Sequence, residues 1–126
     1  MNVLKVKDLK KVYGSKFRSN QYTALNGVDL EVDEGEFVGI MGPSGAGKTT
    51  LLNIIATIDN PTSGSVLISG ENVYHMKDHE LSMFRREKLG FIFQDFNLLD
   101  TLSLKENIIL PLALSKVDVK TIETRC

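Results

Sequence analysis

Nine consecutive residues read Gly42-Pro43-Ser44-Gly45-Ala46-Gly47-Lys48-Thr49-Thr50. They match the pattern G-x-x-x-x-G-K-[ST], in which backbone N–H groups cradle a polyphosphate. The mostly apolar residues 36–41 before them predict a buried strand, and residues 49–56 after them predict a helix. A phosphate-binding loop between a strand and a helix is therefore expected, and this arrangement decides the fold.

The residue types of this loop suit a triphosphate. Its glycines allow the chain to wrap closely around phosphate oxygens, because glycine tolerates positive φ, and the helix that follows adds free N–H groups. Lys48 is expected to reach the β- and γ-phosphates, and the Thr49 hydroxyl to take one position on Mg²⁺. The alternative is a glycine-rich turn that binds nothing, and the rarity of the full motif argues against it.

Composition sets limits on the other possibilities. A chain of 126 residues with 42% hydrophobic residues is large enough for one domain and one core. The net charge of −1 argues against nucleic-acid binding and against a polybasic membrane patch. The apolar run 108–114 is too short to span a membrane, the early charges do not fit a signal peptide, and Cys126 has no internal disulfide partner. We expect a cytoplasmic protein without direct membrane insertion.

The segments before the loop indicate an antiparallel layer. Residues 2–13 alternate in polarity and predict a strand, broken near Asp8, and residues 14–21 predict a loop. Residues 24–32 predict a second strand with its alternate apolar positions on one face, namely Val28, Leu30 and Val32. Two amphipathic strands before a continuous apolar one favour an antiparallel layer against an α/β core.

The segments after the loop are shorter. Residues 65–70 and the apolar residues 89–93 predict strands, the latter buried. Residues 78–88 predict a helix with Asp78 as its N-cap and an apolar side at Leu81 and Phe84. A further helix is expected over residues 104–110, capped by Thr101 or Ser103 and bent or ended by Pro111. From residue 116 onward polar residues dominate, and nothing there is expected to close the fold.

Several of these pieces occur together in one family. Tyr13 precedes the loop, the sequence PTSG follows its helix at residues 61–64, and FIFQ ends a later strand at residues 91–94. This combination resembles the ATP-binding cassette of ABC transporters. Residues 95–102, Asn107 and residues 110–112 are most similar to the ATPases of bacitracin-type antimicrobial-peptide exporters, close to lipoprotein-release and macrolide-export ATPases. The resemblance covers nearly the whole chain but only about the first half of that family's domain.

The resemblance implies a fold and a set of roles. The fold is α/β, a P-loop NTPase (RecA-like) core with an antiparallel β layer, truncated before the helical subdomain is complete. The β layer would cover about residues 1–35, the core about 36–94, and the Q-loop with the start of the helical subdomain about 95–126. Tyr13 would stack on the adenine of ATP, although a tyrosine of the core is the plainer interpretation. Gln94 would reach Mg²⁺ and the attacking water, or would simply be a surface glutamine that opens a loop.

These roles define the predicted site. ATP is bound by Tyr13 and residues 42–50, Mg²⁺ is held by Thr49 and Gln94, and catalysis involves Lys48 and Gln94. In the intact protein, two copies of the domain would enclose ATP at the cytoplasmic face of the membrane and drive a separate membrane permease. Nucleic acid is not an expected partner.

Other motifs of the family have no counterpart in these residues. The leucine-serine-glycine-glycine-glutamine signature, the second acidic motif with its catalytic glutamate, and the later switch histidine are absent. His75 and His79 precede Gln94, so neither can replace the switch histidine. We therefore expect the chain by itself to bind nucleotide with negligible turnover.

Three alternatives remain open at this point. A small kinase-type P-loop enzyme would use Asp95 to hold Mg²⁺, whereas a GTPase is disfavoured because no D-x-x-G occurs. The pair His75 and His79 has the spacing of a helical metal site, but a solvated helix start is the simpler interpretation. The basic residues of the segment 85–88 could contact a partner, but a solvated face is again simpler.

Overall fold

The computed structural model describes residues 1–14, 20–95, 98–116 and 118–125. The chain divides into two compact units, Met1–Leu81 and Ser82–Cys126. Most of the loop predicted over residues 14–21, positions 96–97 of the exporter-type run and the terminal cysteine lie outside the described residues. The subdivision at about residues 35 and 94 stays a prediction.

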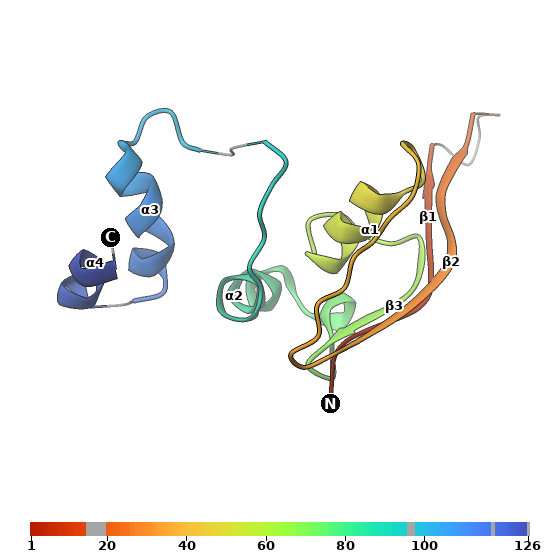
Figure 1. Ribbon diagram of the computed structural model, residues 1–126, viewed down its shortest axis with the longest axis horizontal. Coiled ribbons are helices and arrows are strands. Elements are labelled where there is room, and N and C mark those ends of the chain that lie inside the picture. Colours follow the sequence, from red (N-terminus) through yellow and green to blue (C-terminus); the bar gives the residue numbers. More distant parts are fainter. Residues whose placement is uncertain (15–19, 96–97, 117, 126) are drawn as a thin grey trace. The chain divides into compact units, whose positions relative to one another are not determined.

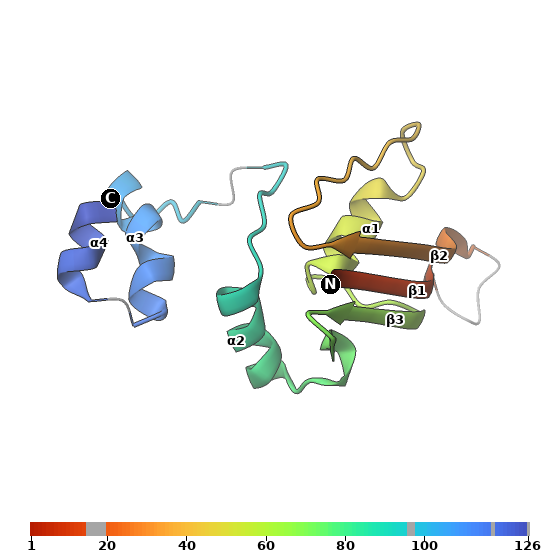
Figure 2. The ribbon, with the colours of Figure 1, turned by 60° about the horizontal axis from the view of Figure 1, so that its bottom comes forward.

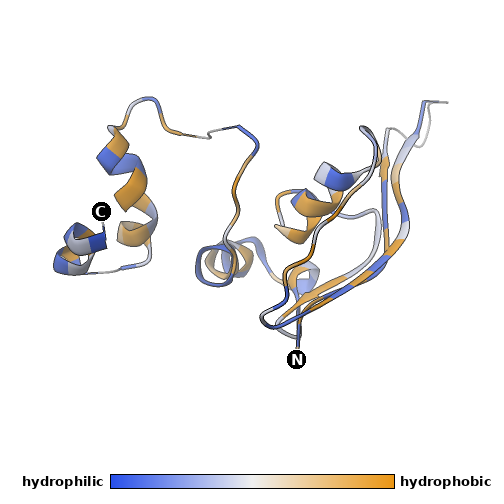
Figure 3. Cartoon of the chain, viewed as in Figure 1, coloured by the Kyte–Doolittle hydropathy of each residue, from blue (hydrophilic) through white to orange (hydrophobic). Residues whose placement is uncertain are grey.

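A four-stranded antiparallel sheet with the order β2-β1-β3-β4 forms most of the first unit (Figure 1). Its strands are β1 (Asn2–Tyr13), β2 (Tyr22–Asp33), β3 (Ser63–Ile68) and β4 (Glu71–Asn72). The first three alternate between apolar and polar residues (Figure 3), which leaves one apolar face to be covered. The predicted antiparallel layer and its first two strands are confirmed, and β3 begins two residues before the predicted strand.

The predicted break near Asp8 is a β-bulge. Asp8 has a φ of 45°, and the pairing of β1 shifts register between Val6 and Leu9. One extra residue here lets Val6 and Leu9 both turn inward, where they are 2% and 0% exposed. Gly64 of β3 passes so close that a Cβ atom on it would lie 2.4 Å from the Asp8 carbonyl oxygen. The bulge is therefore fitted to a glycine on the neighbouring strand.

Helix α1 (Lys48–Ile55) covers one face of the sheet, beside β2 (Figure 2). Its buried residues are Leu51 and Ile54, which are three positions apart and so lie on the same side of the helix. The helix predicted from the loop motif is confirmed to within one residue at each end. After β4, a short 3₁₀ helix η1 (Val73–His75) adds the fully buried Val73 to this core.

The second unit contains helices and irregular segments. It begins within α2 (Asp78–Lys88), because the boundary between the units lies after Leu81. Helix α3 (Leu104–Leu114) starts at a capping box, in which Ser103 accepts from the N–H of Glu106 and Glu106 accepts from the N–H of Ser103. Helix α4 (Val119–Arg125) completes the unit. None of the helices within the described ranges is long and apolar enough to cross a membrane.

Two helix predictions need correction, and one helix was not predicted. Asp78 is the first residue of α2 rather than its cap, although Phe84 is buried and Leu81 half-buried as predicted. Pro111 does not end α3, because the helix continues past it to Leu114 and the N–H of Ser115 donates to the Pro111 carbonyl oxygen at 3.0 Å. The segment after residue 116 contains α4, whose first turn is held by Asp118 accepting from the N–H of Thr121 at 2.9 Å.

The two predicted buried strands, 36–41 and 89–93, are wrong for this structure. Neither segment is a strand, and Phe37, Met41 and Ile92 are 99%, 93% and 97% exposed. A continuous apolar strand is typical of a parallel sheet, where it must be paired on both sides and covered on both faces. No strand among the described residues pairs with either segment, so both remain irregular.

Candidate nucleotide-binding site

The predicted phosphate loop leads directly into α1. Gly45 and Gly47 both have positive φ, 80° and 95°, and Gly47 occupies the N-cap position of the helix. A Cβ atom on Gly47 would lie 2.5 Å from the carbonyl oxygen of Ala24 and 3.0 Å from the Leu25 side chain. Gly45 has open space around its Cα. The loop therefore packs closely against β2 at Gly47, whereas a side chain at Gly45 would meet no atom within 4 Å.

Lys48 closes the loop on itself. Its ammonium Nζ donates to the carbonyl oxygens of Gly42 at 2.6 Å and Pro43 at 2.7 Å. These contacts hold a positive charge over the loop, beside the start of α1. The first N–H groups of a helix have no partners within it, and the Gly47 cap adds no side-chain hydrogen bond. Both the charge and the donors at this end suit an anion.

Tyr22 completes the site and was missed in the sequence. Its hydroxyl donates to the Gly45 carbonyl oxygen at 2.9 Å. An open cavity of about 530 Å³ lies here. Its lining consists of this tyrosine and loop residues, namely Ser44, Gly45, Gly47, Lys48, Thr49 and Thr50. Because Tyr22 is far from the loop in the sequence, only the fold of β2 over the loop reveals it.

Tyr13 lies in the same unit as the loop. It is the direct partner of Tyr22 in the β1–β2 pairing, and opposed residues of two antiparallel strands point to the same face. Its hydroxyl donates to Asp59 Oδ2 at 2.8 Å, and the residue is 40% exposed. Tyr13 is not among the residues that line the cavity beside Tyr22, and its predicted role in stacking on a base stays a prediction.

Asp59 anchors this region electrostatically. Burial alone would raise the pKa of the Asp59 carboxyl, but hydrogen bonds from Lys11, Tyr13 and the Asn60 N–H outweigh it and hold the pKa below its ordinary value. Nearby, burial and the Asp59 charge raise the pKa of the Tyr74 hydroxyl. Asp59 is therefore a charged acceptor, and the raised pKa of Tyr74 keeps that hydroxyl protonated beside it.

Gln94 and Asp95 belong to the other unit. Both are exposed and follow Phe91 and Phe93, whose rings meet edge to face with centroids 4.6 Å apart. The predicted role of Gln94 at Mg²⁺ and the alternative role of Asp95 stay predictions. The histidine pair does not share a helix, because His75 ends η1 and His79 lies in α2. Within the described ranges, no three metal-binding side chains of the His, Cys, Asp and Glu types gather.

The sequence pattern of ABC transporters matches residues 25–125. The chain belongs to this family. An ABC transporter ATP-binding protein of Bacillus subtilis, YvcR, is 58% identical over 99% of this chain and 48% of its own length. The bacitracin export ATP-binding protein BceA of Halalkalibacterium halodurans is 47% identical over 99% of this chain and 49% of its own length.

A solved structure supports the same assignment. The ATP-binding cassette MJ0796, from Methanocaldococcus jannaschii, forms a dimer bound to ADP and phosphate. It matches 88% of this chain and 47% of its own, with a TM-score of 0.81 and 47% identity. The predicted family and the predicted fold class are confirmed. The chain spans about half the length of the relatives it matches.

Proposed function

We propose that this chain binds Mg·ATP through the loop of residues 42–50. The observation that carries the proposal is the seating of Gly47 against β2, which leaves the open side of the loop facing the cavity beside Tyr22. A polyphosphate needs many N–H donors and a fixed cation within a small radius, and the loop, the start of α1 and the Lys48 ammonium supply both. The donor set fits the nucleotide.

The individual roles follow from the chemistry of each group. Lys48 would exchange its two carbonyl partners for β- and γ-phosphate oxygens, and Gly42 and residues 44–47 would contribute backbone N–H groups. The Thr49 hydroxyl, which borders the cavity, would take one position on Mg²⁺. A single protein oxygen is sufficient when phosphates and waters fill the other positions of this ion. Tyr13 would stack on adenine, and Gln94 would complete the metal and water site.

We propose further that the intact protein is the ATP-binding subunit of an ABC exporter. Support comes from relatives named for ATP binding and bacitracin export and from the dimeric cassette that resembles this chain. Two copies would act together at the cytoplasmic face of the membrane, where binding and hydrolysis of ATP drive a permease. Catalysis would involve Lys48 and Gln94.

The 126-residue chain alone is proposed to bind nucleotide with negligible turnover. Its sequence lacks the signature motif and the catalytic glutamate, and phosphoryl transfer needs a group that orients the attacking water. The alternative, a small kinase-type enzyme that holds Mg²⁺ with Asp95, has no supporting contact among the described residues.

A binding measurement tests the proposal. Titration calorimetry with ATP and Mg²⁺ should show one site, and Lys48→Ala should weaken it about ten-fold or more because a charge-assisted contact is lost. The matched control is Lys105→Ala, an exposed lysine of α3 in the other unit, which should leave the affinity unchanged. An affinity that is the same for wild type and Lys48→Ala would contradict the proposal.

Two further measurements address turnover and the alternative. Phosphate release by the chain should stay at background, and release that disappears in Lys48→Ala would contradict the proposal of binding alone. Asp95→Asn and Gln94→Glu are compared for Mg²⁺-dependent affinity. If the Mg²⁺ effect disappears only in Asp95→Asn, the kinase-type alternative is correct.

A further inference from the structure

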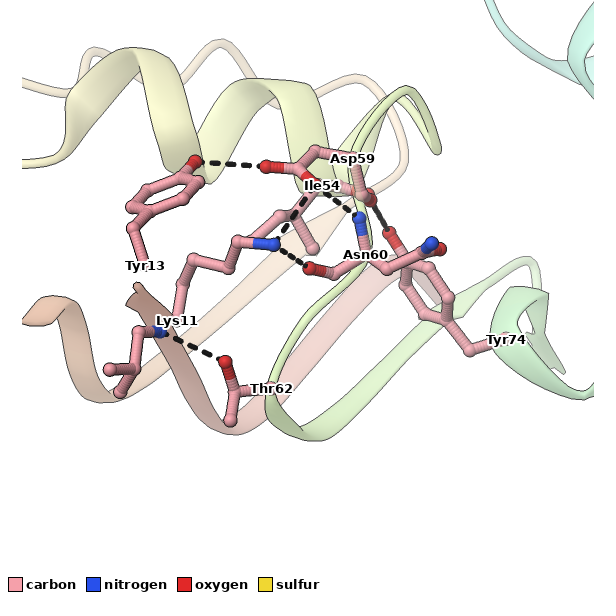
Figure 4. Close-up of polar contacts among 8 residues, drawn as sticks. Lys11, Tyr13, Ile54, Asp59, Asn60, Thr62 and Tyr74 are labelled. Atoms are coloured by element: carbon pink, nitrogen blue, oxygen red, sulfur yellow. Dashed lines mark hydrogen bonds and ion pairs between the residues drawn. The ribbon is translucent and has the colours of Figure 1, made fainter. Parts of the chain in front are cut away.

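The side chains of Lys11, Tyr13 and Asp59 contact one another in a triangle, and the Tyr13 ring is the proposed base-binding group (Figure 4). Lys11 Nζ donates to Asp59 Oδ1 at 3.0 Å, and the Tyr13 hydroxyl donates to the other oxygen, Oδ2, at 2.8 Å. The same Nζ lies 4.9 Å from the centroid of the Tyr13 ring, a distance typical of a cation–π contact. Lys11 and Tyr13 come from one strand, whereas Asp59 follows α1.

The position of Asp59 is fixed by its own backbone. The Tyr74 hydroxyl lies 2.7 Å from the Asp59 carbonyl oxygen and 2.6 Å from that of Ile54, so it bridges the end of α1 and the loop. The N–H of Asn60 donates to the Asp59 carboxylate at 2.8 Å, and the Asn60 carbonyl oxygen accepts from Lys11 at 2.6 Å. The carboxylate therefore has little freedom to follow a moving tyrosine.

This ion pair is better shielded from solvent than others of the sheet. The side chains of Lys11 and Asp59 are 13% and 32% exposed, compared with 46% and 56% for the pair of Lys5 and Glu31. A shielded pair keeps a defined geometry, whereas an exposed one is screened and contributes little. The triangle is thus suited to hold a ring in place.

We propose that Asp59 and Lys11 are positioning residues for Tyr13, which they fix in a pose that offers one ring face to a nucleotide base. The inference rests on the proposed function and deepens it. The ring is held at its Cα by β1, at its hydroxyl by Asp59 and on one face by Lys11, so only the opposite face remains for stacking. A side chain that is already fixed loses no rotamer freedom on binding, which raises affinity without any new contact to the ligand.

The expected ligand preference follows directly. The triangle should raise the affinity for nucleotides that carry a base and should not affect the affinity for the triphosphate group alone. A merely structural tie between β1 and the loop after α1 would affect both ligands equally, because it would act through the fold. ATP and inorganic tripolyphosphate are therefore the two probes, each with Mg²⁺.

The variants are Tyr13→Phe, which keeps the ring and loses only its hydroxyl, and Asp59→Ala, which removes the acceptor. Each should weaken ATP binding roughly three- to ten-fold, the cost of fixing one side chain. The double variant should be no weaker than the single ones, because both remove the same contact. Tripolyphosphate affinity should stay constant throughout. Lys11→Arg should keep the ATP affinity of the wild type, and Lys11→Met should weaken ATP binding to a similar extent as the other variants.

The control is Glu31→Ala, which removes the exposed ion pair to Lys5 on the same strand and should change neither affinity. Equal weakening of both probes in the Tyr13 and Asp59 variants, or an unchanged ATP affinity, would overturn the inference. Since Tyr13→Phe removes one oxygen from a partly exposed ring, it remains informative if Asp59→Ala unfolds the chain. A wild type that binds neither probe would refute the proposed function itself. A wild type that binds both equally would refute only the stacking role of Tyr13.

Discussion

The antiparallel sheet and the apolar stretches 36–41 and 89–93 have similar residues and opposite surroundings. Val6 and Val66 in the sheet are 2% and 0% exposed, whereas Phe37 and Ile92 in the stretches are 99% and 97% exposed. Each strand of the sheet pairs with at least one other strand and needs cover on one face only. A continuous apolar strand needs neighbours and cover on both sides, which its own sequence does not provide. Hydropathy predicts that a strand can form, and the partners decide whether it does.

Truncation of a core residue should give the largest effect. Leu9→Ala should lower the free energy of unfolding by about 2–5 kcal/mol, since the side chain is fully buried in the first unit. Ile92→Ala removes a similar volume from an exposed segment and should change it by less than about 0.5 kcal/mol. Urea unfolding followed by circular dichroism measures both. Equal losses of unfolding free energy in the two variants would show that Ile92 is buried in solution, and the contrast between the sheet and the apolar stretches would not hold.

A glycine pair tests how tightly the sheet is built. Gly64→Ala should destabilise the first unit by about 2 kcal/mol or more, because φ is +94° and the new Cβ would meet the Asp8 carbonyl oxygen at 2.4 Å. Gly70→Ala is the control, with a similar φ of +81° but open space, and should cost about 1 kcal/mol. The difference between their thermal midpoints isolates the close approach. If the midpoints agree, β3 does not pack against the bulge as described.

Acid should weaken the contacts of the Asp59 carboxylate with Lys11 and Tyr13. The pKa of Asp59 is lowered in the folded chain, so its charged form stabilises the fold above the ordinary value of 3.8. This stability is lost as the pH falls through the lowered folded value. Asp59→Asn should therefore flatten the dependence of unfolding free energy on pH in the acid range. Glu31→Gln, whose carboxyl is more exposed, should flatten it less. If Asp59→Asn leaves the pH dependence of the unfolding free energy unchanged, the charge of Asp59 does not stabilise the fold.

The smallest change in stability should come from polar substitutions in the uncovered stretch. Phe37→Ser and Met41→Ser should leave the unfolding free energy within about 0.5 kcal/mol, because both side chains are exposed. Their effect should appear as reduced self-association, since exposed apolar segments favour aggregation. Sedimentation velocity at several concentrations measures this. If both variants associate as the wild type does, residues 36–41 do not mediate self-association.

Local patterns account for what could be predicted from the sequence. The loop motif predicted α1, alternation predicted β1 and β2, and the apolar side of residues 78–88 predicted α2. The motif also predicted that Lys48 and the neighbouring glycines belong to one loop, because they lie close together in the sequence. Tyr22 and Asp59 could not be found in this way. Their partners lie 23 and 46 residues away along the chain, and only the fold brings them together.

The contacts of Lys48 change the meaning of any mutation at that position. Its ammonium donates to two carbonyl oxygens of the loop, at 2.6 and 2.7 Å. If the loop binds phosphate as proposed, phosphate oxygens would replace these two carbonyls, and the observed affinity would be the difference between two sets of charge-assisted bonds. Replacing the lysine with alanine would remove its contact with phosphate and would also deprive the two carbonyl oxygens of their cationic partner. The affinity of the alanine variant would therefore report both changes together.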